Sequence, residues 1–120
     1  MHDTAFRGYR PSSGQGRLRL LLDSKGKIRP CVIVTNNIYN ARVPVIQVVP
    51  IAAWSERKAR IVTNVELPAS QSSGLTKRSV ADCLQTRPVD HRFRLVKVRG
   101  RLPENIMQQI DQALRIVFAL

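Results

Sequence analysis

The chain has 120 residues and a formal net charge of +12, from 20 Lys or Arg against eight Asp or Glu. That length suits one domain, since domains average about 150 residues, and a hydrophobic fraction of 43% can bury a core, which excludes a disordered basic tail. The longest apolar run, Val48–Trp54, is too short for a membrane helix of roughly twenty residues, and Met1–Phe6 lacks the apolar segment of a secretory signal, so we expect a cytoplasmic protein with a polyanionic partner.

The first third of the chain predicts two strands. Residues 1–16 are polar and rich in Gly, Ser and Arg, which indicates a poorly ordered arm. Arg17–Leu22 alternates briefly and then turns apolar, as a short strand does, and Asp23–Lys27 has the composition of a turn. Cys31–Val34 is apolar and mostly β-branched, which predicts a strand buried on both faces, and the turn formers of Asn36–Asn40 end it.

The middle of the chain predicts four more short strands. Pro44–Ile51 is apolar, with prolines near its ends, where a missing N–H is tolerated. Ala59–Leu67 alternates between apolar and polar residues, and a Ser/Gly loop covers Pro68–Lys77. Ser79–Gln85 and Arg94–Val98 complete the set.

The end of the chain predicts a helix of about four turns. Pro103 suits the first helical position, and Glu104 complements the positive end of the helix dipole. Its apolar stripe consists of Ile106, Ile110, Ala113, Leu114 and Val117. Five or six strands followed by one helix predict a mainly β, mostly antiparallel curled sheet or small barrel with a helix against one side, as a single domain over residues 1–120.

The inventory of reactive residues argues against several enzyme classes. Cys31 and Cys83 are isolated, so we expect reduced, packed thiols and no zinc site. The chain has two histidines, one of them in the arm, which disfavours a paired-histidine ribonuclease. Its carboxylates are scattered singly, which disfavours two-metal hydrolysis, so no metal or other cofactor is expected. Arginine, which grips phosphate through two parallel hydrogen bonds, is abundant.

Three features are candidates for binding. Lys27 and Arg29 come just before the most apolar strand, where they form either a phosphate-binding pair or a solvated turn. Residues 87–101 carry six basic side chains, which either contact phosphate or keep the surface soluble. Trp54 lies beside a charged loop, where it stacks a base, anchors a peptide or packs in the core.

These segments also occur in the order found in one protein family. Lys27–Asn40 closely resembles the R-P-x-V-[VI]-[VI]-[ST]-N-D-x-[YF]-N segment of MazF/PemK-type toxins. Further segments resemble the family's next strand, its H-V-E-L motif, its G-L-x-x-x-S-V-A and Q-x-R-T-[VI]-D block, and its ending; they are Val43–Pro50, Asn64–Pro68, Gly74–Ala81, Gln85–Asp90, Arg94–Leu95 and Gly100–Leu120. The resemblance covers about residues 26–120, and its order is more specific than any one piece.

The resemblance implies an SH3-like curled β-barrel of the MazF/PemK/CcdB type with a C-terminal helix, usually a homodimer. Such proteins are toxins of type II toxin–antitoxin systems. They are metal-independent, sequence-specific endoribonucleases that cut single-stranded RNA, both mRNA and rRNA, to 2′,3′-cyclic phosphate ends. A disordered acidic antitoxin silences the same groove, and the complex binds operator DNA.

Residue by residue, the resemblance implies that Arg29 is catalytic and stabilises the phosphorane. It places Lys27, Gln85 and Arg87 beside the RNA-binding groove, and Trp54 and Ser55 in the loop that gates the groove and meets the antitoxin.

Two departures from the family pattern bear on activity. Ala52 and Ala53 stand where the family has its catalytic Thr, and Ser55 is the nearest hydroxyl. The segment Arg7–Gly16 does not match the family's opening, so we discount Arg7, Arg10, Arg17 and Arg19 as evidence for a nucleic-acid surface. Three hypotheses follow: an active endoribonuclease, a catalytically degenerate member that still binds its antitoxin, operator DNA or RNA, and an unrelated RNA- or ribosome-associated barrel.

Overall fold

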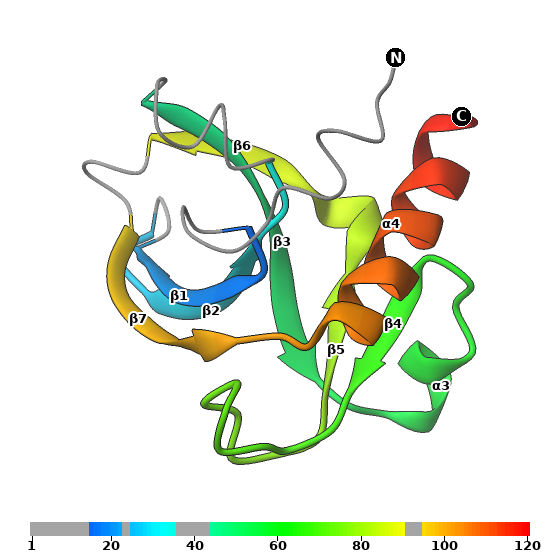
Figure 1. Cartoon of the computed structure of the whole chain (residues 1–120), viewed down its shortest axis with the longest axis horizontal. Coiled ribbons are helices and arrows are strands. Elements are labelled where there is room, and N and C mark those ends of the chain that lie inside the picture. The colour runs from blue at the N-terminus through cyan, green and yellow to red at the C-terminus, as the bar shows by residue number, and fades with distance from the viewer. Residues whose placement is uncertain (1–14, 23–24, 36–43, 91–94) are drawn as a thin grey trace.

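A computed structural model describes residues 15–22, 25–35, 44–90 and 95–120, where seven strands form one curled sheet (Figure 1). The strands run in the order β4-β5-β3-β2-β1-β7, with β6 also paired to β3. They are β1 (Arg17–Leu22), β2 (Ile28–Ile33), β3 (Val45–Ala53), β4 (Asn64–Leu67), β5 (Ser79–Asp82), β6 (Arg87–Asp90) and β7 (Leu95–Arg101). Every ladder between these strands is antiparallel, which confirms the predicted mainly β fold; the sheet curls without closing.

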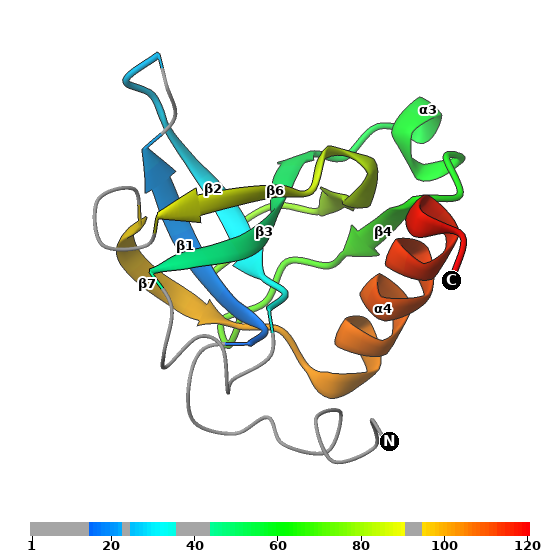
Figure 2. The same cartoon turned by 90° about the horizontal axis from the view of Figure 1, so that it is seen from above.

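Three helical segments accompany the sheet within the described residues. They are α3 (Glu56–Ala59), the short 3₁₀ helix η1 (Cys83–Gln85) and α4 (Glu104–Phe118). The C-terminal helix α4 is confirmed, with Pro103 as its flanking residue rather than its first. It lies over β4 on one side of the molecule, away from β1, β2 and β7 (Figure 2). No helix in the described ranges is long and apolar enough to cross a membrane.

Strand β3 is shared by three partners. Its middle pairs with β2, while its other edge pairs first with β6 and then with β5. Val48 pairs with Arg87 and Ile51 with Ala81, so three steps along β3 correspond to six along the facing chain. The helix η1 takes up the difference, and the Thr86 hydroxyl fixes it by donating to the Val48 carbonyl oxygen at 3.0 Å.

The sheet buries apolar side chains on both faces, because β2 and β3 are apolar at nearly every position. The main core lies beneath α4 and includes Leu18, Val32, Val49, Ile51, Leu67, Met107 and Ile110. A smaller cluster occupies the opposite face and consists of Leu21, Cys31, Ile33, Ile46, Val48, Val89 and Leu95. Adjacent residues of one strand thus belong to different cores, as Val48 and Val49 do.

Two predicted strands are shorter in the structure. Ala59–Leu67 was expected to be one alternating strand, but α3 and a turn precede β4, which begins at Asn64. The hydroxyl of Ser55 accepts a hydrogen bond from the Lys58 backbone N–H at 3.1 Å and so caps α3, a local competitor to the strand. The strand predicted over Ser79–Gln85 ends at Asp82, where η1 follows.

The chain before β1 is held earlier than expected. Gln15 and Gly16, which the sequence assigns to a poorly ordered arm, are buried. The Gly16 N–H donates to the Ile33 carbonyl oxygen and its own carbonyl accepts from the Leu102 N–H, both at 2.8 Å. The rest of the predicted arm, residues 1–14, and the turn predicted at Asn36–Asn40 lie outside the described residues.

The loop between β4 and β5 packs directly on β7. The Arg101 backbone N–H donates to the Ser72 carbonyl oxygen at 2.9 Å, and the Arg99 guanidinium donates to the Gly74 carbonyl oxygen at 2.7 Å. A Cβ atom at Gly100 would overlap the backbone of Ser72 and Ser73. Glycine at this position therefore allows the loop to cover the sheet.

We expect Gly100→Ala to lower the free energy of unfolding by about 1–3 kcal/mol, because the new methyl group has to push the loop backbone off β7. Urea denaturation followed by circular dichroism measures this. Ser72→Ala is the control, because it leaves the backbone contact intact and should change stability by less than about 0.5 kcal/mol. Equal stability of the Gly100→Ala and natural chains would contradict this account of the loop.

Candidate nucleic-acid interface

Arg29 lies near the start of β2 with its side chain exposed. It pairs with Leu21 of β1, and alternation along β2 places it on the same face as Cys31 and Ile33. That face is the one that buries the smaller cluster. The predicted catalytic arginine therefore belongs to the side of the sheet away from α4.

Position 52 lies on the same face. Pro50 of β3 pairs with Cys31, where the ladder between β2 and β3 ends, and alternation along each strand places Ala52 on the face of Pro50 and Arg29 on the face of Cys31. Ala53 follows and has the opposite orientation, because successive strand residues alternate between faces. The position at which the sequence predicts a missing hydroxyl thus shares a face with the predicted catalytic arginine.

Arg87 joins this face from β6. It is exposed and lies two residues before Val89, a member of the smaller cluster, so the two share a face. Burial raises the pKa of the Cys31 thiol to about 12, and the charges of Arg19 and Arg87 oppose that shift. Both guanidinium groups therefore lie close enough to act on one buried thiol.

Lys27 and Gln85 each lie just before a strand that carries one of these arginines, β2 with Arg29 and β6 with Arg87. Lys27 precedes β2 and Gln85 ends η1, and both side chains are exposed. Gln85 is positioned by its neighbour Thr86, whose hydroxyl bonds to β3 and also accepts from the Gln47 side-chain amide at 3.2 Å.

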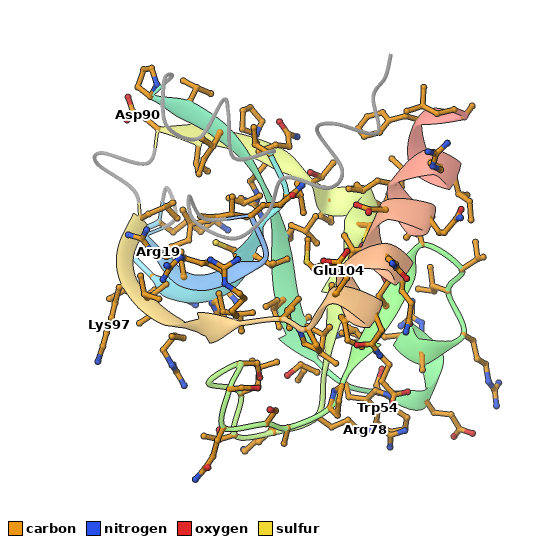
Figure 3. All side chains as sticks on the ribbon, viewed as in Figure 1. Arg19, Trp54, Arg78, Asp90, Lys97 and Glu104 are labelled. Atoms are coloured by element: carbon orange, nitrogen blue, oxygen red, sulfur yellow. The ribbon has the colours of Figure 1, made fainter. Side chains whose placement is uncertain are left out.

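Arg19 is a residue that sequence reasoning set aside. It pairs directly with Cys31, and Figure 3 shows its side chain beside β1, β2 and β7. The signal was available in the alternation of Arg17, Leu18 and Arg19, because a buried Leu18 turns both arginines to the other face. We call Arg19, Arg29 and Arg87 together the arginine face.

Trp54 follows β3 and is covered by an arginine. The guanidinium carbon of Arg78 lies 3.9 Å from the centroid of the indole ring, a cation–π contact. The Nε atom of Arg78 is 2.6 Å from Oε2 of Glu66, which holds the guanidinium over the ring (Figure 3). Glu66 pairs with Val80, which in turn pairs with Ala52, so this stack adjoins position 52.

The Trp54 stack has an electrostatic signature. The hydrogen bond from Arg78 holds the pKa of the exposed Glu66 carboxyl below its usual value, and the indole of Trp54 makes a smaller contribution. The indole nitrogen is buried and has no hydrogen-bond partner of regular geometry. A base or peptide could reach this face of the ring only after displacing Arg78, or could stack on the guanidinium itself.

Ser55 has a structural contact of its own. Its hydroxyl caps α3, as described above, and the structure gives no contact between it and the arginine face. It lies at the end of β3 next to Trp54.

The cysteines and histidines of the chain form no reactive cluster within the described residues. Cys31 and Cys83 are buried free thiols, as predicted, and burial raises the pKa of Cys83 to about 12 as well. Within residues 15–22, 25–35, 44–90 and 95–120, no three His, Cys, Asp or Glu side chains gather as metal ligands would. Both histidines, His2 and His91, lie outside those ranges.

Comparison with known proteins gives one family and one fold. The family model described as "PemK-like, MazF-like toxin of type II toxin-antitoxin system" matches residues 19–118. The Mycobacterium tuberculosis toxin MazF-mt6 is 21% identical with a TM-score of 0.73, over 87% of this chain and 97% of that chain. MazF from Deinococcus radiodurans is 18% identical with a TM-score of 0.74, over 89% and 96%. None of the curated proteins compared with the chain matches it.

A mycobacterial endoribonuclease solved in complex with its cognate antitoxin is also similar. It is 21% identical with a TM-score of 0.72, and the match covers 88% of this chain and 94% of that chain. These likenesses confirm the predicted SH3-like, MazF-type curled fold.

We expect Arg78→Ala to shift the fluorescence of Trp54, the one tryptophan of the chain, to longer wavelength and to increase its quenching by acrylamide at least about twofold, because one ring face becomes open to water. Arg60→Ala is the matched control: Arg60 also pairs with a carboxylate, that of Glu56 at 3.1 Å, and has no ring contact. Unchanged quenching in Arg78→Ala would contradict the stacked geometry.

The same signal should depend on pH. The pKa of Glu66 is lower in the folded chain than that of an ordinary glutamate. The ion pair between Glu66 and Arg78 is therefore fully formed above the ordinary glutamate pKa, and it is lost as the pH falls through the lowered pKa. Glu66→Gln should abolish this acid transition in Trp54 fluorescence.

Proposed function

Because this chain belongs to the PemK-like, MazF-like toxins of type II toxin–antitoxin systems, we propose that it is a metal-independent, sequence-specific endoribonuclease acting on single-stranded RNA, mRNA or rRNA, in the cytoplasm. The observation that carries this proposal is the position of Arg29, exposed on a face that also holds Arg19 and Arg87. Guanidinium groups gathered on one face suit a substrate whose reacting group is a phosphodiester.

The proposed reaction is an internal transfer within the RNA. The 2′ oxygen bonds to the neighbouring phosphorus, its proton passes to solvent, and the bond from phosphorus to the 5′ oxygen breaks. The 5′ oxygen takes up a proton, so the products are a 2′,3′-cyclic phosphate and a 5′ hydroxyl. Arg29 stabilises the negative charge that gathers on the phosphoryl oxygens in the transition state. Lys27, Gln85 and Arg87 bind the flanking nucleotides.

We further propose three partners. An acidic antitoxin segment occupies the same face, guided by the net charge of +12, and meets the loop with Trp54 and Ser55. The toxin–antitoxin complex binds operator DNA. The chain forms a homodimer, which is supported by exposed apolar side chains on the last turn of α4 and just beyond it, with Ile116 52%, Phe118 55% and Leu120 84% exposed.

A second candidate function rests on Ala52. In this reading the chain binds RNA, operator DNA and antitoxin but turns substrate over poorly, because a hydroxyl that would hold the phosphate is missing on the face that carries Arg29. Loss of one such preorganised contact lowers the rate by about 10²–10³. The two candidates differ in the rate of cleavage and not in binding.

We expect purified protein to cut mixed-sequence RNA in the presence of EDTA and Arg29→Ala to cut at least about 10²-fold more slowly, because the charge on the phosphoryl oxygens is then unopposed. Gel analysis with chemistry specific for 2′,3′-cyclic phosphate ends measures both. Arg60→Ala, an exposed arginine of the α3 region, is the control for loss of charge. Cleavage that persists in Arg29→Ala would overturn the assignment of Arg29, and cleavage that EDTA abolishes would overturn metal independence.

We expect Ala52→Thr to raise the cleavage rate by about 10–10³-fold, because it restores a hydroxyl on the face that carries Arg29. Ala53→Thr is the matched control, since the neighbouring residue has the opposite orientation, and it should leave the rate unchanged. If the natural chain has no measurable cleavage and Ala52→Thr creates it, the second candidate function is correct. An equal rate for all three chains shows that position 52 does not limit turnover.

A further inference from the structure

A polar group at the base of the arginine face has no partner. The Nε atom of Arg19 is buried and makes no hydrogen bond to the rest of the described chain. Burial lowers the pKa of this guanidinium, and the charge of Arg17 adds to that effect. Buried donors are nearly always paired, because an unpaired one loses its bonds to water without replacement. The site therefore lacks an acceptor.

The surroundings of Arg19 define the missing acceptor as an anion. The described segments of β1, β2, β3, β6 and β7 contain one carboxylate, Asp90, and alternation with the buried Val89 places it on the other face. Arg19 pairs with Cys31, and Arg29 is two residues before Cys31 on β2, so the two arginines are diagonal cross-strand neighbours. Such neighbours have Cα atoms about 7–8 Å apart, which long side chains span.

The floor between the arginines is apolar. Cys31 is fully buried, and its thiol stays protonated because burial raises its pKa to about 12. A neutral floor adds no negative charge that would compete with an anion for the guanidinium groups above it. A phosphodiester has two non-bridging oxygens, which accept from two N–H groups of one arginine. This suits the planar guanidinium better than an anion of a single atom does.

We propose that Arg19 is a further phosphate-binding residue of the RNA site, which holds a phosphodiester over Cys31 together with Arg29 and Arg87. The proposal rests on the proposed function for its ligand, an RNA strand. Arg19 supplies a contact on the side of the sheet where Ala52 supplies none. It is a binding residue, so its loss acts on affinity first.

Lys97 provides a matched control. It pairs with Leu20, the residue next to Arg19 in β1, yet its side chain is exposed and points away from Arg19 (Figure 3). Lys97→Ala and Arg19→Ala remove the same charge from neighbouring positions. Any difference between them reports the direction of the side chain and not the net charge.

The test measures binding and cleavage separately. Binding uses a labelled single-stranded 2′-O-methyl RNA pool, which cannot be cut because its 2′ oxygen is blocked, in an anisotropy titration at several salt concentrations. Cleavage uses the unmodified pool. Arg19→Ala should bind about tenfold to a hundredfold more weakly than the natural chain, with a salt dependence reduced by about one phosphate contact, because a charged hydrogen-bonded pair is lost. Lys97→Ala should bind within about twofold of the natural chain.

Arg19→Lys keeps the positive charge and loses the two parallel N–H donors of the guanidinium, so we expect an affinity for the blocked RNA between those of the natural chain and Arg19→Ala. It also serves if Arg19→Ala fails to fold, which thermal melting shows. Equal RNA affinities for Arg19→Ala and Lys97→Ala would overturn the proposal. The same titration is repeated with a labelled polyglutamate peptide. If Arg19→Ala weakens binding of this peptide and not of RNA, the acceptor is an acidic segment and the proposal is also overturned.

The outcomes separate this proposal from the proposed function. A natural chain that cuts RNA with Arg19→Ala unaffected leaves the endoribonuclease standing and removes Arg19 from its site. A natural chain that binds the blocked RNA, loses that binding in Arg19→Ala and cuts nothing supports Arg19 and overturns the endoribonuclease. A natural chain that binds no RNA overturns both.

Discussion

The structure depends on how strand β3 is shared. Residues 48–50 of β3 (Val45–Ala53) pair with β2 along one edge, while residues 45–48 pair with β6 and residues 51–53 with β5 along the other. A strand paired on both edges and apolar on both faces has no freedom of register, because a slip of one residue would exchange its two buried faces. Val48 and Val49 show the consequence, since each anchors a different cluster. The two faces of the sheet are thereby assigned, one to α4 and one to the arginine face.

That assignment converts a diffuse charge into a local one. The chain carries a net charge of +12, yet most cations at a protein surface are solvated and recognise nothing in particular. The fold selects Arg19, Arg29 and Arg87 from separate strands and directs them to one side. Arg78 is withdrawn from this group, because Glu66 and the ring of Trp54 occupy it. Position in the sheet, more than the number of arginines, determines which of them share a face.

The sequence predicted the elements with a long local pattern and missed those that are short or that depend on distant partners. The apolar runs of β2 and β3 and the stripe of α4 were sufficient to identify them. The break at η1 was missed, because it arises from a bond between Thr86 and Val48, which are 38 residues apart. α3 has four residues and one capping hydroxyl, too weak a pattern to outweigh the alternation around it.

The candidate site was predictable to a similar extent. Family resemblance identified Arg29 and the departure at Ala52, whereas their alignment across β2 and β3 needed the register. Arg19 was discounted because the resemblance is weakest in its segment, although alternation with Leu18 carries the information. Resemblance transfers the residues that relatives share, so a residue particular to this chain has to be found from its own geometry.

The contrast between Arg19 and Ala52 bears on what this face can do. A guanidinium that grips a phosphate equally before and during reaction improves binding but leaves the rate of bound substrate unchanged. A hydroxyl aimed at the phosphoryl oxygens acts chiefly where negative charge develops, so its absence lowers turnover more than affinity. A chain with the arginine and without the hydroxyl is therefore biased toward holding RNA over cutting it. Under the proposed function, Arg29 alone would then carry most of the transition-state stabilisation that this face offers, and the balance between cleavage and binding would rest on that one side chain.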